Sequence, residues 1–215
     1  MASSKIRASF WNHDNCIPLS CDLAPASIFE RHRDYLVFDV ETKDLAPRDF
    51  SLENLAALGI SVACAWDSKD KKMHTFFEKD LTRLVELCYE RLVVGYNIRR
   101  FDLPVMAGYG LKPEKVDVFD LMEEVERGLG RRWVKLEYVA QGTLGEGKSG
   151  DGKEAVEWFK QGRFEELAKY CARDVEVTHR VFRHGIDKGF LAVEFPESKS
   201  GGDGGGRKEF VTDWT

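Results

Sequence analysis

The chain has 215 residues, of which 43% are hydrophobic and 32% are charged, with a formal net charge of -5 and a pI near 5.6. This composition is that of a soluble globular protein with one core, and the acidic balance lacks the basic footprint that non-specific nucleic-acid binding usually leaves. No stretch approaches the roughly 20 apolar residues of a membrane helix and the N-terminus has no hydrophobic signal core, so we expect a cytoplasmic protein with no membrane contact.

The sequence divides into three parts. We interpret residues 1–34 as an N-terminal extension, residues 35–197 as one domain, and residues 198–215 as a glycine-rich linker with a tail, at 210–215, for which we consider docking back as an edge strand. Residue patterning predicts the elements of the domain. In chain order these are strands at 35–42, 57–66 and 72–77, a helix at 81–91, a strand at 92–96, a helix at 102–109, a strand at 116–119, and helices at 121–129, 133–141, 154–160 and 163–184.

This order of elements predicts an α/β fold. The first three strands come directly one after another, as in an antiparallel meander, and the later strands alternate with helices. That pattern predicts a mixed sheet of five to six strands with helices on both faces, an arrangement like that of ribonuclease H.

Two carboxylates interrupt the first predicted strand. Asp39 and Glu41 are two residues apart in an otherwise apolar run, and strand side chains alternate between faces, so both point the same way. An ionised acid in a sheet core costs roughly several kcal/mol unless it is paired or coordinated. The pattern therefore indicates a bound cation, whereas an exposed strand end with solvated acids is the alternative.

Two later segments place acids in similar settings. Asp102 comes after a buried strand and lies near the start of a predicted helix, where an acid can also serve simply as a cap. Tyr170 and Asp174 are four residues apart in the last long helix, so a phenol and a carboxylate share one helix face. Taken alone, such a pair is more often a surface feature than a catalytic one.

The cysteines and histidines show no metal-ligand spacing. The odd number of cysteines and the lack of a C-x-x-C pair argue against a disulfide framework and a zinc ribbon. The five cysteines are Cys16, Cys21, Cys64, Cys88 and Cys171. We expect them to be reduced, and we expect any metal to be bound by oxygen ligands.

Three short motifs occur in a definite order: D-x-E-T at residues 39–42, N-x-x-x-F-D at residues 97–102, and Y-x-x-x-D at residues 170–174. Together they resemble the DEDD, or DnaQ-like, superfamily of 3′-5′ exonucleases, in its tyrosine-containing DEDDy subgroup. The resemblance covers residues 35 to 190 approximately. In detail it is strongest to the exonuclease domains of family B DNA polymerases and to YprB-type ribonuclease-H-like domains.

The resemblance implies a metal-dependent 3′-5′ exonuclease that acts on the 3′ end of a single-stranded nucleic acid. It implies two divalent cations, Mg²⁺ or Mn²⁺, which carboxylate ligands suit. By resemblance, Asp39, Glu41 and Asp174 hold the ion that activates the attacking water. Asp39 also bridges to the second ion, and Asp102 supports that ion through water. Tyr170 orients the water by a hydrogen bond.

The same resemblance suggests residues that handle substrate. Thr42 and Leu45 come after the first motif, where family members contact the terminal nucleotide through a hydroxyl or backbone group and an apolar wedge. Asn97 and Phe101 belong to the second motif, and Phe101 can equally be a core aromatic. The chain departs from the family at Asp44, where a glycine is common and a negative charge opposes close approach of phosphate.

Residues 142–149 formally satisfy the phosphate-binding pattern G-x-x-x-x-G-K-[ST]. A P-loop must leave a strand and open directly into a helix, but a helix is predicted before this segment, and glycines at positions 150 and 152 interrupt the residues after it. We therefore do not expect a nucleotide triphosphatase.

A second class of function stays open from the sequence. A ribonuclease-H-like module with weak or no catalysis would bind nucleic acid or a protein partner, and the acidic net charge favours it slightly. The complete set of four acids and a tyrosine favours the enzyme. The sequence does not show whether a helicase or polymerase partner exists, nor whether the substrate is DNA or RNA.

Overall fold

The structure, a computed structural model, describes residues 34–146, 152–196 and 205–214. The N-terminal extension, apart from residue 34, and most of the glycine-rich linker lie outside these residues. No helix within the described ranges is long and apolar enough to cross a membrane.

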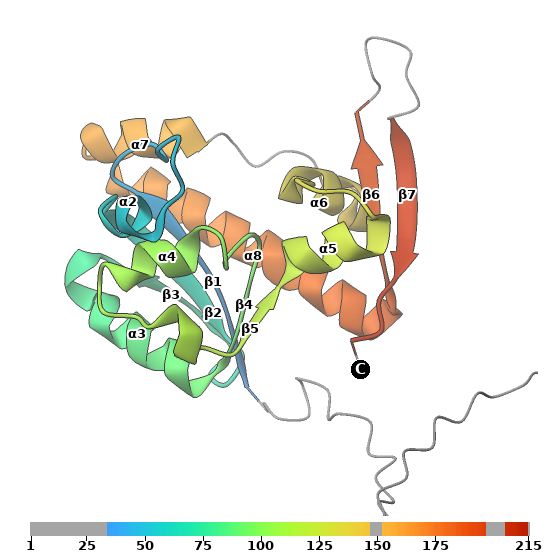
Figure 1. The fold of residues 1–215 in the computed structure, drawn as a ribbon, viewed down its shortest axis with the longest axis horizontal. Helices are drawn as coiled ribbons and strands as arrows, with labels where there is room; N and C mark the ends of the chain where they lie inside the picture. Colours follow the sequence, from blue (N-terminus) through green and yellow to red (C-terminus); the bar gives the residue numbers. More distant parts are fainter. Residues whose placement is uncertain (1–33, 147–151, 197–204, 215) are drawn as a thin grey trace, which may run out of the picture.

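The main sheet has five strands in the order β3-β2-β1-β4-β5 (Figure 1). At its centre, β1 is antiparallel to β2 on one side and parallel to β4 on the other, while β3 is antiparallel to β2 and β5 parallel to β4. The strands are β1 (Tyr35–Thr42), β2 (Ile60–Asp67), β3 (Lys72–Phe76), β4 (Leu92–Gly95) and β5 (Val118–Asp120). The predicted mixed sheet of an α/β fold is confirmed.

Helices pack against both faces of this sheet, as predicted, and contribute to two separate apolar clusters. On one face lie α2 (Leu52–Ala56), α3 (Leu81–Glu90) and α4 (Asp102–Ala107). The cluster of the other face includes α5 (Leu121–Leu129), α6 (Leu136–Leu144), α7 (Gly152–Lys160) and α8 (Phe164–Lys188). Two 3-10 turns, η1 (Glu78–Asp80) and η2 (Pro113–Lys115), complete the connections.

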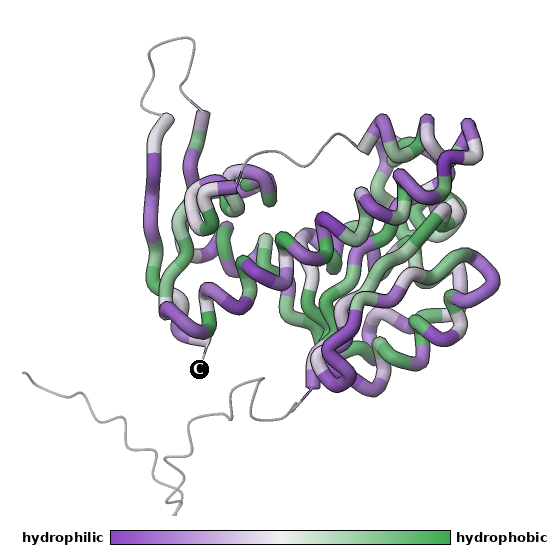
Figure 2. Tube along the Cα trace, turned by 180° about the vertical axis from the view of Figure 1, so that it is seen from behind, coloured by the Kyte–Doolittle hydropathy of each residue, from purple (hydrophilic) through white to green (hydrophobic). Residues whose placement is uncertain are grey.

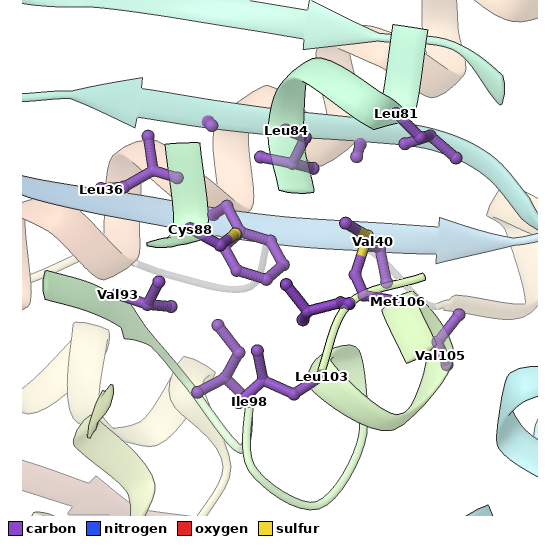
Figure 3. Close-up of a cluster of buried hydrophobic side chains, with 14 of the residues drawn as sticks. Leu36, Val40, Leu81, Leu84, Cys88, Val93, Ile98, Leu103, Val105 and Met106 are labelled. Carbon is purple, nitrogen blue, oxygen red and sulfur yellow. The ribbon is translucent and has the colours of Figure 1, made fainter. Parts of the chain in front are cut away.

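Alternation along β1 builds the first of these clusters. Leu36 and Val40 point toward α3 and α4, where Leu84, Cys88 and Leu103 meet them (Figure 3). All five side chains are buried. The alternate residues of β1, Val37, Asp39 and Glu41, therefore face the opposite side of the sheet, which is the side covered by α8.

α8 packs on β1 and β2 through one stripe of its surface. The buried residues recur three or four positions apart, which places them on one face of the helix. They include Leu167, Cys171, Val175, Thr178 and Phe182. In Figure 2, hydrophobic residues concentrate in the strands of the main sheet, whereas hydrophilic residues recur along α8. The helix ends at Gly189, whose φ of 74° suits a left-handed cap.

One helix and one strand were not predicted, and β2, β5 and α6 each begin two or three residues later than expected. The unpredicted elements are α2 and β6 (Phe190–Phe195). α6 begins at Leu136 instead of residue 133, because Trp133 has a φ of 60°, which is outside the helical region.

The C-terminal tail pairs with the unpredicted strand. β7 (Gly206–Val211) is antiparallel to β6, and the two form a separate two-stranded sheet instead of extending the main one. The tail thus forms a strand, but earlier in the chain than the predicted 210–215 and on a partner that the sequence did not reveal. After β7, Trp214 packs edge-on against Phe119 with 4.9 Å between ring centroids and donates a hydrogen bond of 2.9 Å to Glu124. A side chain at Gly185 would collide with the indole, so this glycine is needed for the close approach.

This packing predicts that the tail stabilises the domain. Trp214 is 5% exposed, so Trp214→Ala should lower the free energy of unfolding by about 3 kcal/mol through lost burial and a residual cavity. Urea denaturation followed by far-UV circular dichroism measures the change. Val211→Ala in the same tail is the control, since Val211 is 82% exposed and its truncation should change stability by less than about 0.5 kcal/mol. Equal midpoints for the two variants would contradict the packing argument.

Candidate active site

β1 presents two carboxylates to α8. Asp39 and Glu41 are half-buried, while Val40 between them is buried on the opposite face. The thiol of Cys171 on α8 donates a hydrogen bond of 3.4 Å to the backbone carbonyl of Asp39 and lies 3.9 Å from its carboxylate Oδ2. The apolar stripe of the helix thus brings α8 directly against the strand that bears the acids.

α8 adds a third carboxylate and a phenol to the same place. One oxygen each from Asp39, Glu41 and Asp174 lie within 4.8 Å of one another. Tyr170, one turn before Asp174, is half-buried and hydrogen-bonds to the Asp174 side chain. The four residues come from two elements more than 100 positions apart in the sequence, and the docking of α8 unites them.

Asp102 lies beside this group and not within it. It is in the first turn of α4, is 3% exposed, and accepts a hydrogen bond of 3.0 Å from the backbone N–H of Val40. Its charge raises the pKa of both Asp39 and Glu41, so it is electrostatically part of the cluster. All five predicted catalytic residues therefore converge, with Asp102 held apart by its bond to β1.

Burial and like charge disfavour ionisation of these acids. Burial is the largest cause of the raised pKa of Asp39 and of Glu41, and the neighbouring carboxylates add to it. Burial likewise raises the pKa of Asp102 to about 7, against the opposing effect of backbone N–H groups that favour its charged form. Burial also raises the pKa of the Tyr170 phenol, which therefore keeps its proton at neutral pH.

The donor set fits a hard divalent cation. Within the described ranges, no basic side chain forms an ion pair with Asp39 or Glu41. A bound cation would therefore offset their negative charges. Carboxylate oxygens are the ligands that Mg²⁺ and Mn²⁺ prefer. Burial raises the pKa of the adjacent Cys171 thiol, which keeps it protonated and unsuited to bind metal.

The residues after the first motif lie next to the acids in the chain but differ in exposure. Thr42 is buried and its hydroxyl donates a hydrogen bond of 2.7 Å to the backbone carbonyl of Asp44. Leu45 is 56% exposed and free to meet a ligand. The negative charge of Asp44, a departure from the family, is met by Lys160 of α7, with 3.6 Å between Nζ and Oδ1.

The residues of the second motif lie in the loop between β4 and α4. Asn97 has a left-handed φ of 61°, which asparagine tolerates better than most residues. Its side-chain oxygen is enclosed and has no hydrogen-bond partner in the described part of the chain. Phe101 is half-buried with its ring 6.4 Å from that of Phe50, which is 55% exposed.

Sequence reasoning missed the residue that holds this loop in place. The buried carboxylate of Asp120, at the end of β5, accepts hydrogen bonds from the backbone N–H groups of Asn97 at 2.9 Å and Arg99 at 3.0 Å. It also caps α5 through Met122 N–H at 3.0 Å. The sequence does show an acid between a short strand and a helix. Such an acid is explained equally well as a helix cap, so it did not indicate a role in holding the loop.

A second missed residue supports the tyrosine. Trp158 of α7 packs edge-on against Tyr170, with 5.7 Å between ring centroids. Nothing in the sequence pairs these two residues, because the contact depends on how α7 lies across α8.

The P-loop pattern is broken by a helix. Residues 142–144 belong to α6, and Gly145 caps its end with a φ of 71°, so no strand leads into the motif. The rest of the pattern, from residue 147 onward, lies outside the described residues. The structural requirement of a strand before the loop is therefore not met.

Comparison with known proteins assigns the chain to a family. Residues 36–185 match the RNase_H superfamily, and the protein belongs to it. No curated protein sequence matches the chain.

Two solved structures are similar in fold. One is a family B DNA polymerase from the archaeon Pyrobaculum calidifontis, with a TM-score of 0.55 and 16% identity over 71% of this chain and 24% of the polymerase. The other is RNase D from Trypanosoma brucei, with a TM-score of 0.50 and 18% identity over 70% of this chain and 56% of that protein. The chain thus corresponds to only part of each of these proteins.

The raised pKa of Asp102 predicts how metal-free protein responds to pH. An acid whose pKa is higher in the folded than in the unfolded state stabilises the fold while protonated, and that stability is lost as pH rises toward the folded pKa. With an unfolded pKa near ~4 and the folded pKa at about 7, the melting temperature in EDTA should fall as pH is raised from ~5 to ~7 and level off above that.

Asp102→Asn is the matched control for this pH response. The amide keeps an oxygen that accepts from Val40 N–H but cannot ionise. The variant should therefore show a smaller fall in melting temperature over the same pH range. Identical slopes for wild type and Asp102→Asn would show that Asp102 does not titrate there.

Proposed function

We propose that the protein is a metal-dependent nuclease that removes nucleotides from the 3′ end of a single-stranded nucleic acid. The observation that carries the proposal is the convergence of three carboxylate oxygens within 4.8 Å, with Asp102 and Tyr170 alongside. Membership of the RNase_H superfamily and the similarity in fold to RNase D support it. The 3′-5′ polarity rests on the order of the three motifs, which resembles that of the DEDDy exonucleases.

The chain would bind two divalent cations, Mg²⁺ or Mn²⁺. Asp39, Glu41 and Asp174 would hold the first, and Asp39 together with Asp102 the second. When bound, such ions polarise the phosphodiester and lower the pKa of water near the reacting phosphorus. The like charges that raise the pKa of Asp39 and Glu41 would then be offset by positive charge, so the carboxylates would be ionised in the loaded protein.

The protein's own side chains position the reactants. Tyr170 keeps its phenolic proton at neutral pH and would orient the attacking water by a hydrogen bond. Leu45, which is 56% exposed, would pack against the terminal base. Thr42 and Phe101 would contact the same terminal nucleotide. Attack on phosphorus then breaks its bond to the 3′ oxygen of the preceding nucleotide and releases a nucleoside 5′-monophosphate.

The second candidate is a binding module of the same fold with no catalysis. It would bind nucleic acid or a protein partner, and one observation, the net charge of -5, favours the protein partner, because acidic proteins bind polyanions poorly. The two candidates differ in hydrolysis: the module would retain bound nucleic acid without shortening it.

The direct test is incubation with a single-stranded oligonucleotide labelled at its 5′ end, with Mg²⁺ or Mn²⁺. The nuclease should produce a ladder of 5′-labelled products that shorten one nucleotide at a time. Asp39→Ala should reduce the rate by about 10³-fold or more, since it removes a shared ligand from the proposed metal site.

Asp70→Ala is the matched control for this test, because Asp70 is an exposed acid beyond the cluster that pairs with His74. The control should retain the wild-type rate. Shortening from the 5′ end would overturn the proposed polarity. Persistent binding without shortening would favour the module.

A separate variant isolates the tyrosine. Tyr170→Phe removes only the hydroxyl, so kcat should fall by about 10²-fold while Mn²⁺ affinity, measured by isothermal titration calorimetry, stays close to wild type. An unchanged kcat would remove Tyr170 from the mechanism. A large loss of Mn²⁺ affinity would show instead that the phenol supports the metal site.

A further inference from the structure

The connection from α5 to α6 (Figure 1) carries a feature that the proposed chemistry does not use. Trp133 lies in this connection and is 63% exposed, although a tryptophan is normally largely buried. Its φ of 60° is left-handed, a conformation that is unfavourable for a bulky residue. The surrounding structure therefore holds a large indole at the surface despite the cost of its exposure and of its backbone conformation, which points to a function.

Specific contacts fix the indole in this position. Its backbone N–H donates a hydrogen bond of 2.7 Å to Glu126 Oε1. The same carboxylate pairs with both terminal nitrogens of Arg100, at 3.1 and 2.8 Å. The guanidinium of Arg100 lies 5.1 Å from the centre of the Trp133 ring, and that of Arg132 lies 5.8 Å from it. The result is an exposed indole on an anchored backbone, with two guanidinium groups over its ring.

The surroundings of Trp133 are basic in a protein that is acidic overall. Residues 127–135 contain four cations and no acid, whereas the whole chain has a net charge of -5. Arg127 pairs with Glu124 on α5. Within the described ranges, Arg131, Arg132 and Lys135 form no ion pair, and all three are exposed. Arg131 lies over the ring of Phe195, 4.2 Å from its centre, and Lys135 over that of Tyr138 at 5.7 Å. These contacts leave the positive charges without a carboxylate partner, so they can still attract a phosphate.

The aromatic surface lies at the same edge of the sheet as the acids. β1 and β4 are parallel with Val37 paired to Val94, so Asp39 and Tyr96 come next at the same level on neighbouring strands. The hydroxyl of Tyr96 donates a hydrogen bond of 2.6 Å to the backbone carbonyl of Val134, which fixes the connection there. Arg100, which flanks the indole, is two residues before Asp102 in the same loop.

We propose that Trp133, Arg132 and the neighbouring unpaired cations form a binding platform for a nucleotide upstream of the scissile bond in a single-stranded nucleic acid. The indole stacks on a base, and Arg131, Arg132 and Lys135 contact the phosphates on either side. Aromatic stacking next to free cations is the chemistry that recognises single strands, whose bases are unpaired, without regard to sequence. A duplex does not offer its base faces to such a platform. This inference rests on the proposed function only for the direction in which the strand runs.

Binding is measured by fluorescence anisotropy with the full chain in EDTA at ~50 mM salt, so that no hydrolysis is needed. The probes are 5′-fluorescein oligo(dT) and oligo(U) of about 12 nucleotides, with a blunt duplex of equal length for comparison. Trp133→Ala should weaken binding to the preferred single strand by about 10-fold or more, and Trp133→Phe should restore most of it. Arg132→Ala should weaken binding and reduce the slope of log Kd against log salt by about 0.7.

Two variants on α3 control for the loss of an exposed aromatic and of a surface charge. Tyr89 is 45% exposed and Arg83 is exposed, and neither lies in the α5 to α6 connection. Tyr89→Ala and Arg83→Ala should leave the affinity at the wild-type value. Equal losses in these controls would mean that the effect of Trp133→Ala is not specific and would overturn the platform.

A spectroscopic measurement separates stacking from a structural role. Unlabelled oligonucleotide should quench tryptophan fluorescence in the wild type, and part of that quenching should be absent in Trp133→Phe even though the variant still binds.

The outcomes distinguish this inference from the proposed function. Unchanged affinity in Trp133→Ala would overturn the platform, and would be the result if the surface serves a protein partner, while leaving nuclease activity to its own test. Loss of affinity in Trp133→Ala, rescued by Trp133→Phe, would support the platform even if the protein proved catalytically silent. Equal affinity for duplex and single strand would contradict the stacking mechanism.

Discussion

The structure is organised around the repulsion among carboxylates that share one half-buried site. Asp39, Glu41 and Asp174 bring like charges within 4.8 Å of one another, and Asp102 adds a fourth charge beside them. Burial and repulsion both act against the ionised forms, and only Asp102 gains an offset that the structure records, from backbone N–H groups. The apolar packing of α8 on the sheet holds the group together. Apolar burial in the core thus stabilises a site in which the carboxylates repel one another, and a bound cation would offset that repulsion.

The two faces of the sheet have different tasks. The face covered by α3 and α4 is an apolar core, and it fixes β1 through Leu36 and Val40. On the other face, β1 carries the apolar Val37 and then the acids Asp39 and Glu41, and α8 meets both. Asp120 links the two sides, since it holds the loop that leads to Asp102 and also caps α5. The α5 to α6 connection comes directly after that helix, so the clustered acids and the exposed Trp133 depend on one shared framework at the carboxyl edge of the strands.

Much of the fold was predictable because its signals are local. Strand alternation placed β1 within its observed bounds, and apolar spacing located α3, α5 and α8 to within a few residues. The elements that were missed are short, with five residues in α2 and six in β6, so neither repeats a period over many positions. β6 comes after a long helix and pairs with a strand beyond the glycine-rich linker, so only its distant partner defines it as a strand. α6 begins later than its residues suggest because the bond from Trp133 N–H to Glu126 holds a left-handed backbone that no propensity scale anticipates.

The sequence by itself determined which residues form the candidate site, because each motif is short and its geometry is local: alternate positions of a strand share a face, as do positions four apart in a helix. Only the tertiary structure decided that these faces meet. The docking of α8 sets the separation of the oxygens, and the bond from Val40 N–H places Asp102 beside the group. The tertiary structure also decided that Trp133 lies next to Arg100, because one residue comes before β5 in the chain and the other after it. Distances between remote segments depend on packing, which a pattern of residue types does not encode.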